Sequence, residues 1–226
     1  MIKTKNQGNL IIISGTTCAG KGTVIRKLLE SHNDIDLSIS YTSRPKREHE
    51  VDGVDYYFVT QEEFEKKIEN DEFLEYAQVH YGAYYGTPKK EIQEKLDKGK
   101  DVILEIDVQG AKIVKEKFPD TVLIFIMAPS MEEVKRRILM RGEETVDQII
   151  SRFKVAYNEI NEYNNYNYVV VNDDLALSVK KVEAILMSEK LRVDRIEDLA
   201  VENQEEIIHE LLIDKEFDNS VKRIDE

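Results

Sequence analysis

The sequence is poor in the residues that build covalent or metal frameworks, since it has a single cysteine, Cys18, and no tryptophan. One cysteine excludes an intramolecular disulfide and any zinc site made of several cysteines. The longest apolar runs, Leu10–Ile13 and Val122–Ala128, are far too short to span a bilayer. The first residues also lack the apolar stretch of a signal peptide. We therefore expect a soluble, cytoplasmic protein whose cysteine stays reduced.

A surplus of positive charge is also missing, because the 226 residues carry a net charge of −13. Proteins that bind nucleic acid or anionic membranes usually present a basic face, so neither is expected as a principal partner. The acidity is concentrated at the end: residues 189–226 contain 13 acidic and 6 basic side chains. The preceding part is much closer to neutral, which leaves room for a local basic cleft.

What the sequence does contain is a regular alternation of strand-like and helix-like segments. Apolar runs rich in β-branched residues predict five strands, at residues 9–14, 37–40, 101–107, 121–128 and 168–172. Helical periodicity lies between them, at residues 21–31, 111–117, 131–141 and 146–161. This alternation predicts an α/β fold with a five-stranded parallel sheet and helices on both of its faces.

Residues 41–97 interrupt the alternation. Strand-like segments at 55–60 and 72–79 flank a helical segment at 61–70, which predicts an inserted α+β lobe. The core is expected at 1–40 and 98–190, with a mobile helical lid at about 137–152. Residues 191–226 form an acidic C-terminal extension. Because no glycine or proline follows Gly142, the last third of the chain is predicted to be mostly helical.

A glycine-rich loop between the first predicted strand and helix gives the strongest chemical signal. It consists of Gly15, Thr16, Thr17, Cys18, Ala19, Gly20, Lys21, Gly22 and Thr23. In this strand–loop–helix context, backbone N–H groups, the helix N-terminus and a lysine together bind a polyphosphate such as that of ATP. The alternative is an ordinary glycine-rich turn. For Cys18, a small side chain in a turn is favoured over a nucleophile.

The loop departs from the usual pattern at one position. Gly22 stands directly after Lys21, where most phosphate-binding loops have a hydroxyl that reaches Mg²⁺, and Thr23 follows. Gly-Lys-Gly-Thr resembles the loop of adenylate kinases. That resemblance implies Mg²⁺ held mainly through the ATP phosphates and waters, near Thr23.

Two further segments have an ordinary interpretation when each is taken alone. Residues 40–47 combine hydroxyls and cations, which is typical of a solvated basic loop. Residues 84–88 are rich in aromatic side chains and could form a turn that faces the core.

Taken together and in order, these segments resemble the guanylate kinase family from about Asn9 to Leu186. The matching segments are residues 15–23, 40–47, 50–59, 73–77, 85–88, 104–110, 141–145 and 171–174. Within them, Glu105 replaces a common aspartate. The stretch after about Leu191 has no counterpart in the typical family pattern.

The resemblance implies a P-loop NTPase-type fold and an ATP:GMP phosphotransferase with Mg²⁺ as cofactor and GMP or dGMP as acceptor. The implied ligands of the GMP phosphate are Ser40, Arg44, Arg47, Tyr56 and Tyr85. The resemblance also implies that Glu75 and Thr87 recognise guanine, with Asp107 beside them. The implied lid arginines around the transferred group are Arg137, Arg141 and Arg152, and Asn172 lies near the adenine of ATP.

These residue types suit the chemistry. Guanine presents two adjacent N–H donors that one carboxylate can accept, whereas adenine would place a lone pair against it. Transfer between two nucleotides needs cations more than a strong base, because the attacking phosphate oxygen is already anionic. The four histidines are scattered and are not expected to be catalytic.

Two other functions stay open. A non-catalytic guanylate-kinase-like module for protein binding would not need Lys21 or the lid arginines, which are all present. A P-loop kinase with another acceptor would not need the pair Glu75 and Thr87. The sequence sets no oligomeric state.

Overall fold

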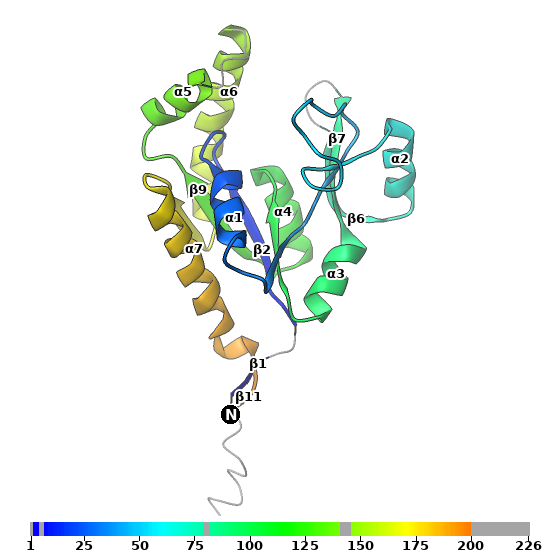
Figure 1. Ribbon diagram of the computed structural model, residues 1–226, viewed down its shortest axis with the longest axis vertical. Coiled ribbons are helices and arrows are strands. Elements are labelled where there is room, and N and C mark those ends of the chain that lie inside the picture. Colours follow the sequence, from blue (N-terminus) through cyan, green and yellow to red (C-terminus); the bar gives the residue numbers. More distant parts are fainter. Residues whose placement is uncertain (1, 5–6, 79–81, 141–145, 200–226) are drawn as a thin grey trace, which may run out of the picture. The chain divides into compact units, whose positions relative to one another are not determined.

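The computed structural model describes residues 2–4, 7–78, 82–140 and 146–199 of the chain. It divides into two compact units, residues 6–189 and residues 1–5 with 190–226 (Figure 1). Within the described ranges, no helix is both long and apolar enough to cross a membrane.

The centre of the larger unit is a five-stranded parallel sheet, as predicted. Its strand order is β10-β9-β2-β8-β3. The strands are β2 (Leu10–Gly15), β3 (Ile35–Leu37), β8 (Asp101–Glu105), β9 (Val122–Met127) and β10 (Tyr168–Val171). All six residues of the central β2 are buried, because it pairs with a strand on each side and both faces of the sheet are covered.

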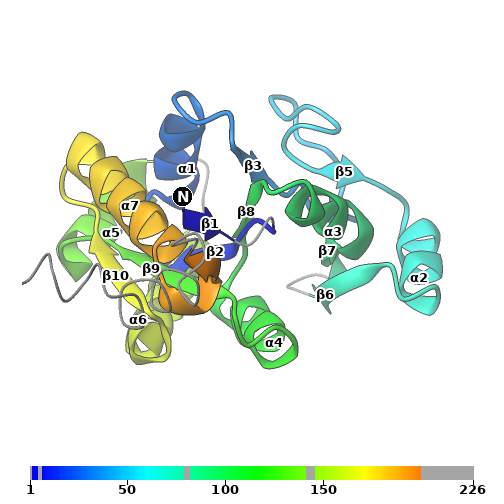
Figure 2. The ribbon, with the colours of Figure 1, turned by 90° about the horizontal axis from the view of Figure 1, so that it is seen from below.

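Helices cover both faces of this sheet. Alternate residues of β2 point to opposite faces, so Ile11 and Ile13 join one apolar cluster while Ile12 joins another. The first cluster includes residues of α1 (Lys21–Leu29) and α7 (Leu175–Lys190), and the second includes residues of α3 (Lys89–Asp97) and α4 (Val108–Lys117). Figure 2 shows α1 and α7 on one side of the sheet and α4 on the other.

The strand expected at residues 37–40 is displaced toward the N-terminus. Strand β3 ends at Leu37, and the N–H of Ser38 still donates to the carbonyl of Ile103 at 2.9 Å. After this bond the chain passes from the large sheet to a second sheet, so Ser40 pairs with no strand of the large sheet. An apolar alternation alone did not reveal where pairing with β8 ends.

Residues 41–88 build a second sheet, hereafter the small sheet, with strand order β5-β4-β7-β6. Its strands are β4 (Tyr41–Thr42), β5 (Tyr57–Phe58), β6 (Phe73–Gln78) and β7 (Tyr84–Pro88). Helix α2 (Gln61–Glu69) begins with a reciprocal capping box between Thr60 and Glu63. Its fully buried Phe64 stacks on Phe73 and Tyr84, which fixes the helix on the sheet.

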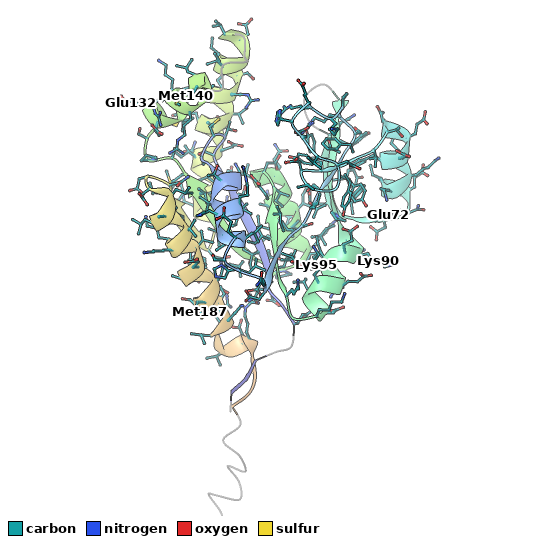
Figure 3. All side chains as sticks on the ribbon, in the orientation of Figure 1. Glu72, Lys90, Lys95, Glu132, Met140 and Met187 are labelled. Carbon is teal, nitrogen blue, oxygen red and sulfur yellow. The ribbon has the colours of Figure 1, made fainter. Side chains whose placement is uncertain are left out.

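Two helices follow β9 and make a third apolar cluster. Helix α5 (Met131–Met140) and helix α6 (Val146–Ile160) pack through Val134, Ile138 and Ala156. Figure 3 labels Glu132 and Met140 near the two ends of α5. The predicted helices at 131–141 and 146–161 are thus present, whereas Arg141 lies outside the described residues.

The smaller unit contains a pairing that the sequence did not predict. Strand β1 (Ile2–Thr4) pairs in antiparallel orientation with β11 (Ile196–Leu199), which a short 3₁₀ turn at Val193–Arg195 precedes. The described part of the last third is mostly helical as expected, and residues 196–199 are an exception. The absence of glycine and proline permits a helix, but a strand forms here because a partner from the far end of the chain pairs with it.

Candidate active site

The glycine-rich loop has the backbone geometry that its glycines predict. Gly15 has φ of +139°, and a Cβ atom there would lie 1.8 Å from the carbonyl oxygen of Ile126 in the neighbouring β9. Gly20, with φ of +90°, is the residue that caps α1, and in the described chain no side chain accepts a hydrogen bond at this cap. The first turn of α1 therefore presents N–H groups to an anion, as in other phosphate-binding loops.

Lys21 lies over the loop. Its Nζ donates to the carbonyl oxygens of Gly15 at 3.0 Å and Thr16 at 3.2 Å. An ammonium group held at this point can reach the terminal phosphates of a nucleotide bound on the loop amides.

Two carboxylates that the motif does not include lie close to the loop. A Cβ atom on Gly22 would lie 3.3 Å from an Oε of Glu105, the last residue of β8. On the other side, Oε2 of Glu159 from α6 accepts a hydrogen bond from the N–H of Thr17 at 2.6 Å. Burial raises the pKa of both carboxyl groups, and the nearby Lys21 acts in the opposite direction on each.

Two residues from distant segments contact the loop at Ala19. The guanidinium of Arg137 donates to the carbonyl oxygens of Ala19 and Asn172, each at 3.0 Å, and its Nε donates to Glu133 at 2.7 Å. The amide of Asn172 also donates to Ala19, at 2.8 Å. The structure thus joins Arg137 and Asn172 to the loop. Arg152 lies half-buried on α6.

A buried polar pair lies between β6, at one edge of the small sheet, and its neighbour β7. Glu75 on β6 stands opposite Thr87 on β7, and the Thr87 hydroxyl donates to Oε1 of Glu75 at 2.5 Å. Glu75 is 6% exposed and Thr87 1% exposed, and burial raises the pKa of the Glu75 carboxyl. The register of β6 and β7 brings Glu75 and Thr87 together, because residues directly opposite in an antiparallel pair have adjacent side chains.

Helix α4 closes one side of this pair. Asp107 is the N-cap of α4 and accepts a hydrogen bond from the N–H of Gly110 at 2.8 Å. A Cβ atom on Gly110 would lie 3.2 Å from Oε2 of Glu75. Because glycine stands there, the helix can approach the carboxylate closely without a side chain between them.

Arg44 lies in the loop that follows β4, and its guanidinium contacts two tyrosine side chains. Its Nε donates to the hydroxyl of Tyr85 at 2.8 Å, and its guanidinium carbon lies 5.1 Å from the centre of the Tyr56 ring. Burial raises the pKa of Tyr56, and the charges of Tyr85 and Glu105 add to this.

The comparisons with known proteins agree on one family. The family model described as guanylate kinase matches residues 7–189. A guanylate kinase of Clostridium perfringens (strain SM101) is 55% identical over 213 residues, which cover 94% of this chain and 98% of that protein. A guanylate kinase of Caldanaerobacter subterraneus is 53% identical over 204 residues, covering 90% of this chain and 98% of that one.

A solved structure agrees as well. The crystal structure of guanylate kinase from Anaplasma phagocytophilum superposes with a TM-score of 0.72 at 36% identity, covering 91% of this chain and 96% of that chain. The chain belongs to the guanylate kinase family.

The comparisons add one observation about the C-terminal extension. Because 213 of the 226 residues align with the Clostridium perfringens guanylate kinase, no more than 13 lie outside that alignment. Most of residues 191–226 therefore has a counterpart in this guanylate kinase, although the family model ends at residue 189. The expectation that this stretch has no counterpart holds for the family pattern alone.

Several predicted guanylate kinase residues meet in the structure, while their ligand roles stay predictions. Glu75, Thr87 and Asp107 come together around Gly110. Tyr56 and Tyr85 both contact the guanidinium of Arg44. Arg47 is exposed, with 60% of its side-chain area accessible, and Ser40 is half-buried directly before β4. Arg141 lies outside the described residues.

Three carboxylates have structural positions that the sequence did not assign. Glu105 gave one signal, since acidic residues at the carboxyl end of a parallel strand often face a ligand. No sequence signal pointed to Glu159, because 142 residues separate it from its partner Thr17. Glu50 lies buried against Arg44 and is considered below.

Proposed function

We propose that this chain transfers the γ-phosphoryl group of ATP to GMP, giving ADP and GDP. Membership of the guanylate kinase family supports the reaction class, which is ATP-dependent phosphoryl transfer. The observation that carries the acceptor assignment is the buried pair of Glu75 and Thr87. Both substrates are cytoplasmic nucleotides, so we also propose a cytoplasmic location.

Glu75 supplies the recognition of guanine. Its carboxylate has two oxygens, of which Oε1 accepts from Thr87 while Oε2 faces Gly110. A carboxylate has about four lone-pair directions, so both oxygens keep capacity to accept N1–H and N2–H of guanine. A buried acceptor facing the N1 lone pair of adenine would lose its hydrogen bonds to water without replacement, which disfavours AMP.

The proposed chemistry depends on cations at the transferred group. Lys21 lies on the loop that binds the donor phosphates, and Arg137 already contacts that loop through Ala19. We assign Arg152 and Arg141 to the same group through the family resemblance. Such cations neutralise charge that spreads over the phosphoryl oxygens in the transition state, and no strong base is needed.

Mg²⁺ is the proposed cofactor, bound with ATP. Among the described residues no group of three acidic, histidine or cysteine side chains is arranged to hold a metal ion. One carboxylate, Glu105, lies beside Gly22, and Thr23 follows on α1. This set fits Mg²⁺, which keeps several waters and binds through phosphates and one or two carboxylates. When bound, the ion neutralises phosphate charge.

The acceptor is tested by a coupled assay of ADP formation with ATP and either GMP, dGMP or AMP. We expect turnover with GMP and a kcat/KM at least about 100-fold lower with AMP, because the acceptor site loses paired hydrogen bonds. Equal use of AMP would contradict the guanine assignment. The absence of turnover with every acceptor would favour the non-catalytic module.

Gly22→Ser tests how the metal is held. The new Cβ would lie 3.3 Å from Glu105, whose flexible carboxylate can move by a few tenths of an ångström. We expect kcat to change by less than about tenfold, or 1.4 kcal/mol, if Mg²⁺ is held through phosphates and waters. The measurement is kcat across a Mg²⁺ titration, with Gly22→Ala as the control that adds the Cβ without the hydroxyl. A large gain in kcat for serine alone would show that the natural loop lacks a metal ligand it needs.

A further inference from the structure

We propose that Glu50 is a positioning residue for the phosphate of the acceptor nucleotide, an inference that rests on the proposed function. Glu50 lies in the loop between β4 and β5, and only 7% of its side-chain area is exposed. A buried carboxylate beside a site for an anionic ligand is unfavourable unless its charge is fully paired. The hydrogen-bonding partners of Glu50 must therefore balance its charge.

Both oxygens of Glu50 are paired with the two arginine residues of the loop. Nη2 of Arg44 donates to Oε1 at 2.5 Å and Nη1 to Oε2 at 2.7 Å, which is a bidentate pair. The backbone N–H of Arg47 donates to Oε2 at 2.9 Å. The hydrogen bond from Arg44 is the main cause that lowers the pKa of Glu50 to about 2. The carboxylate is thus ionised and closes the loop from Arg44 to Glu50.

This pairing determines what Arg44 can offer to a ligand. Its five N–H groups include one that donates to Tyr85 and three that donate to Glu50 and the carbonyl of Pro45. Within the described part of the chain, one N–H on Nη2 is left for a phosphate oxygen. The Tyr85 hydroxyl accepts from Arg44, so its own proton is directed elsewhere and can be donated to the same ligand.

The pair also fixes the position of Arg44 over aromatic rings. The guanidinium carbon lies 5.1 Å from the centre of the Tyr56 ring and 5.5 Å from that of Phe58. Burial keeps Tyr56 neutral by raising its pKa, so its hydroxyl stays a donor. Without Glu50, a long arginine side chain would have to be ordered when the ligand binds, which costs affinity.

The net charge for the phosphate then comes from the other cations of the loop. Because Arg44 and Glu50 neutralise each other, these are Lys46, whose Nζ donates to the carbonyl oxygen of Glu50 at 2.9 Å, and Arg47, whose Nη1 lies 4.0 Å from Oε1 of Glu50. Glu50 is an anion and cannot bind phosphate, so it acts by holding the guanidinium of Arg44 in place. Its replacement should therefore affect GMP and leave ATP unaffected.

A double-mutant cycle with Glu50→Gln and Arg44→Met tests this. Glutamine keeps the shape but places an NH₂ group against guanidinium donors, so we expect KM for GMP to rise about 10- to 100-fold. KM for ATP should stay within about twofold, and kcat should fall less than KM rises. In the double variant, KM for GMP should match that of Arg44→Met within about twofold, because Glu50 acts through Arg44.

The controls separate this role from a purely structural one. Glu62→Gln makes the same change on the exposed face of α2, and we expect wild-type constants. Thermal unfolding and titration of GMP without ATP accompany each variant. If Glu50→Gln is unfolded at the assay temperature, Glu50→Asp replaces it in the cycle, with a smaller expected rise in KM for GMP and the same non-additivity.

The outcomes are distinguishable. Effects of Glu50→Gln and Arg44→Met that multiply, or a rise in KM that is equal for ATP and GMP, would overturn the positioning role. An unchanged KM for GMP in Glu50→Gln would overturn it as well. A wild-type protein that forms no ADP with GMP would instead refute the proposed function.

Discussion

Replacing Lys21 with alanine is expected to lower kcat by at least about 100- to 1000-fold, the effect of removing one charged donor from a phosphoryl or oxyanion site. The ammonium lies on the loop, held by the carbonyl oxygens of Gly15 and Thr16 at 3.0 and 3.2 Å. Its loss removes a positive charge from the terminal phosphates of ATP and leaves the strand and helix around the loop in place. The measurement is steady-state kcat with saturating ATP and GMP.

Lys27→Ala is a matched control on the same helix. Its ammonium pairs with Glu30 at the surface, with 55% of its side-chain area exposed. Surface pairs of this kind contribute little to stability, so we expect unchanged kinetics and a nearly unchanged Tm. Turnover of Lys21→Ala near that of the natural chain would remove the kinase interpretation. A large fall in Tm would mean that Lys21 holds the loop together rather than acting on phosphate.

Replacing Glu75 with glutamine is expected to lower kcat/KM for GMP by ten- to several-hundred-fold, since hydrogen bonds to a charged group contribute about 1.5–3 kcal/mol. The glutamine oxygen can still accept from Thr87, at the place where Oε1 of Glu75 accepts at 2.5 Å. Its NH₂ group then confronts a guanine N–H, which leaves two donors facing each other. KM for ATP should barely move, because Glu75 lies on the small sheet and not on the loop.

The control for Glu75 is Glu72→Gln, directly before β6. Glu72 pairs with Lys67 at the surface and is labelled in Figure 3. We expect it to leave both substrates unaffected. Equal losses for ATP and GMP in Glu75→Gln would mean that Glu75 supports the fold instead of recognising the base.

Acidic pH gives an independent measurement on Glu75. Burial raises its pKa above that of an exposed glutamate, so its carboxylate is protonated at a higher pH as acid is added. Recognition of guanine needs the ionised form. KM for GMP should therefore rise as the pH falls through this raised pKa, and the Glu75→Gln variant should lack that part of the pH dependence.

Local patterns predicted the elements best where the sequence signal and the tertiary environment agree. The run at Leu10–Gly15 is apolar and β-branched, and the structure buries it on both faces as the central strand. The glycines of the loop are required by positive φ and by the close approach of β9, which a Gly-x4-Gly-Lys pattern anticipates. Helices α5 and α6 follow from their apolar periodicity.

Contacts between distant segments could not be predicted in this way. The pair of Thr17 and Glu159 joins residues 142 apart, and the contact between Arg137 and Ala19 joins residues 118 apart. No local propensity encodes a partner at such separation, because the partner is chosen by how the sheet and helices pack. Strand β11 shows the same: its formation depends on β1 at the other end of the chain.

The sequence by itself determined the phosphate-binding loop, the alternation that makes a parallel sheet, and, through family resemblance, the set of residues proposed to bind GMP. These depend on short-range geometry and on residue types that chemistry requires at fixed spacing. Only the tertiary structure decided that Glu75 meets Thr87, that Asp107 caps α4 beside them, and that Glu50 neutralises Arg44. Strand register and helix packing determine which of these side chains come into contact. Both depend on burial across the whole unit and not on any one segment.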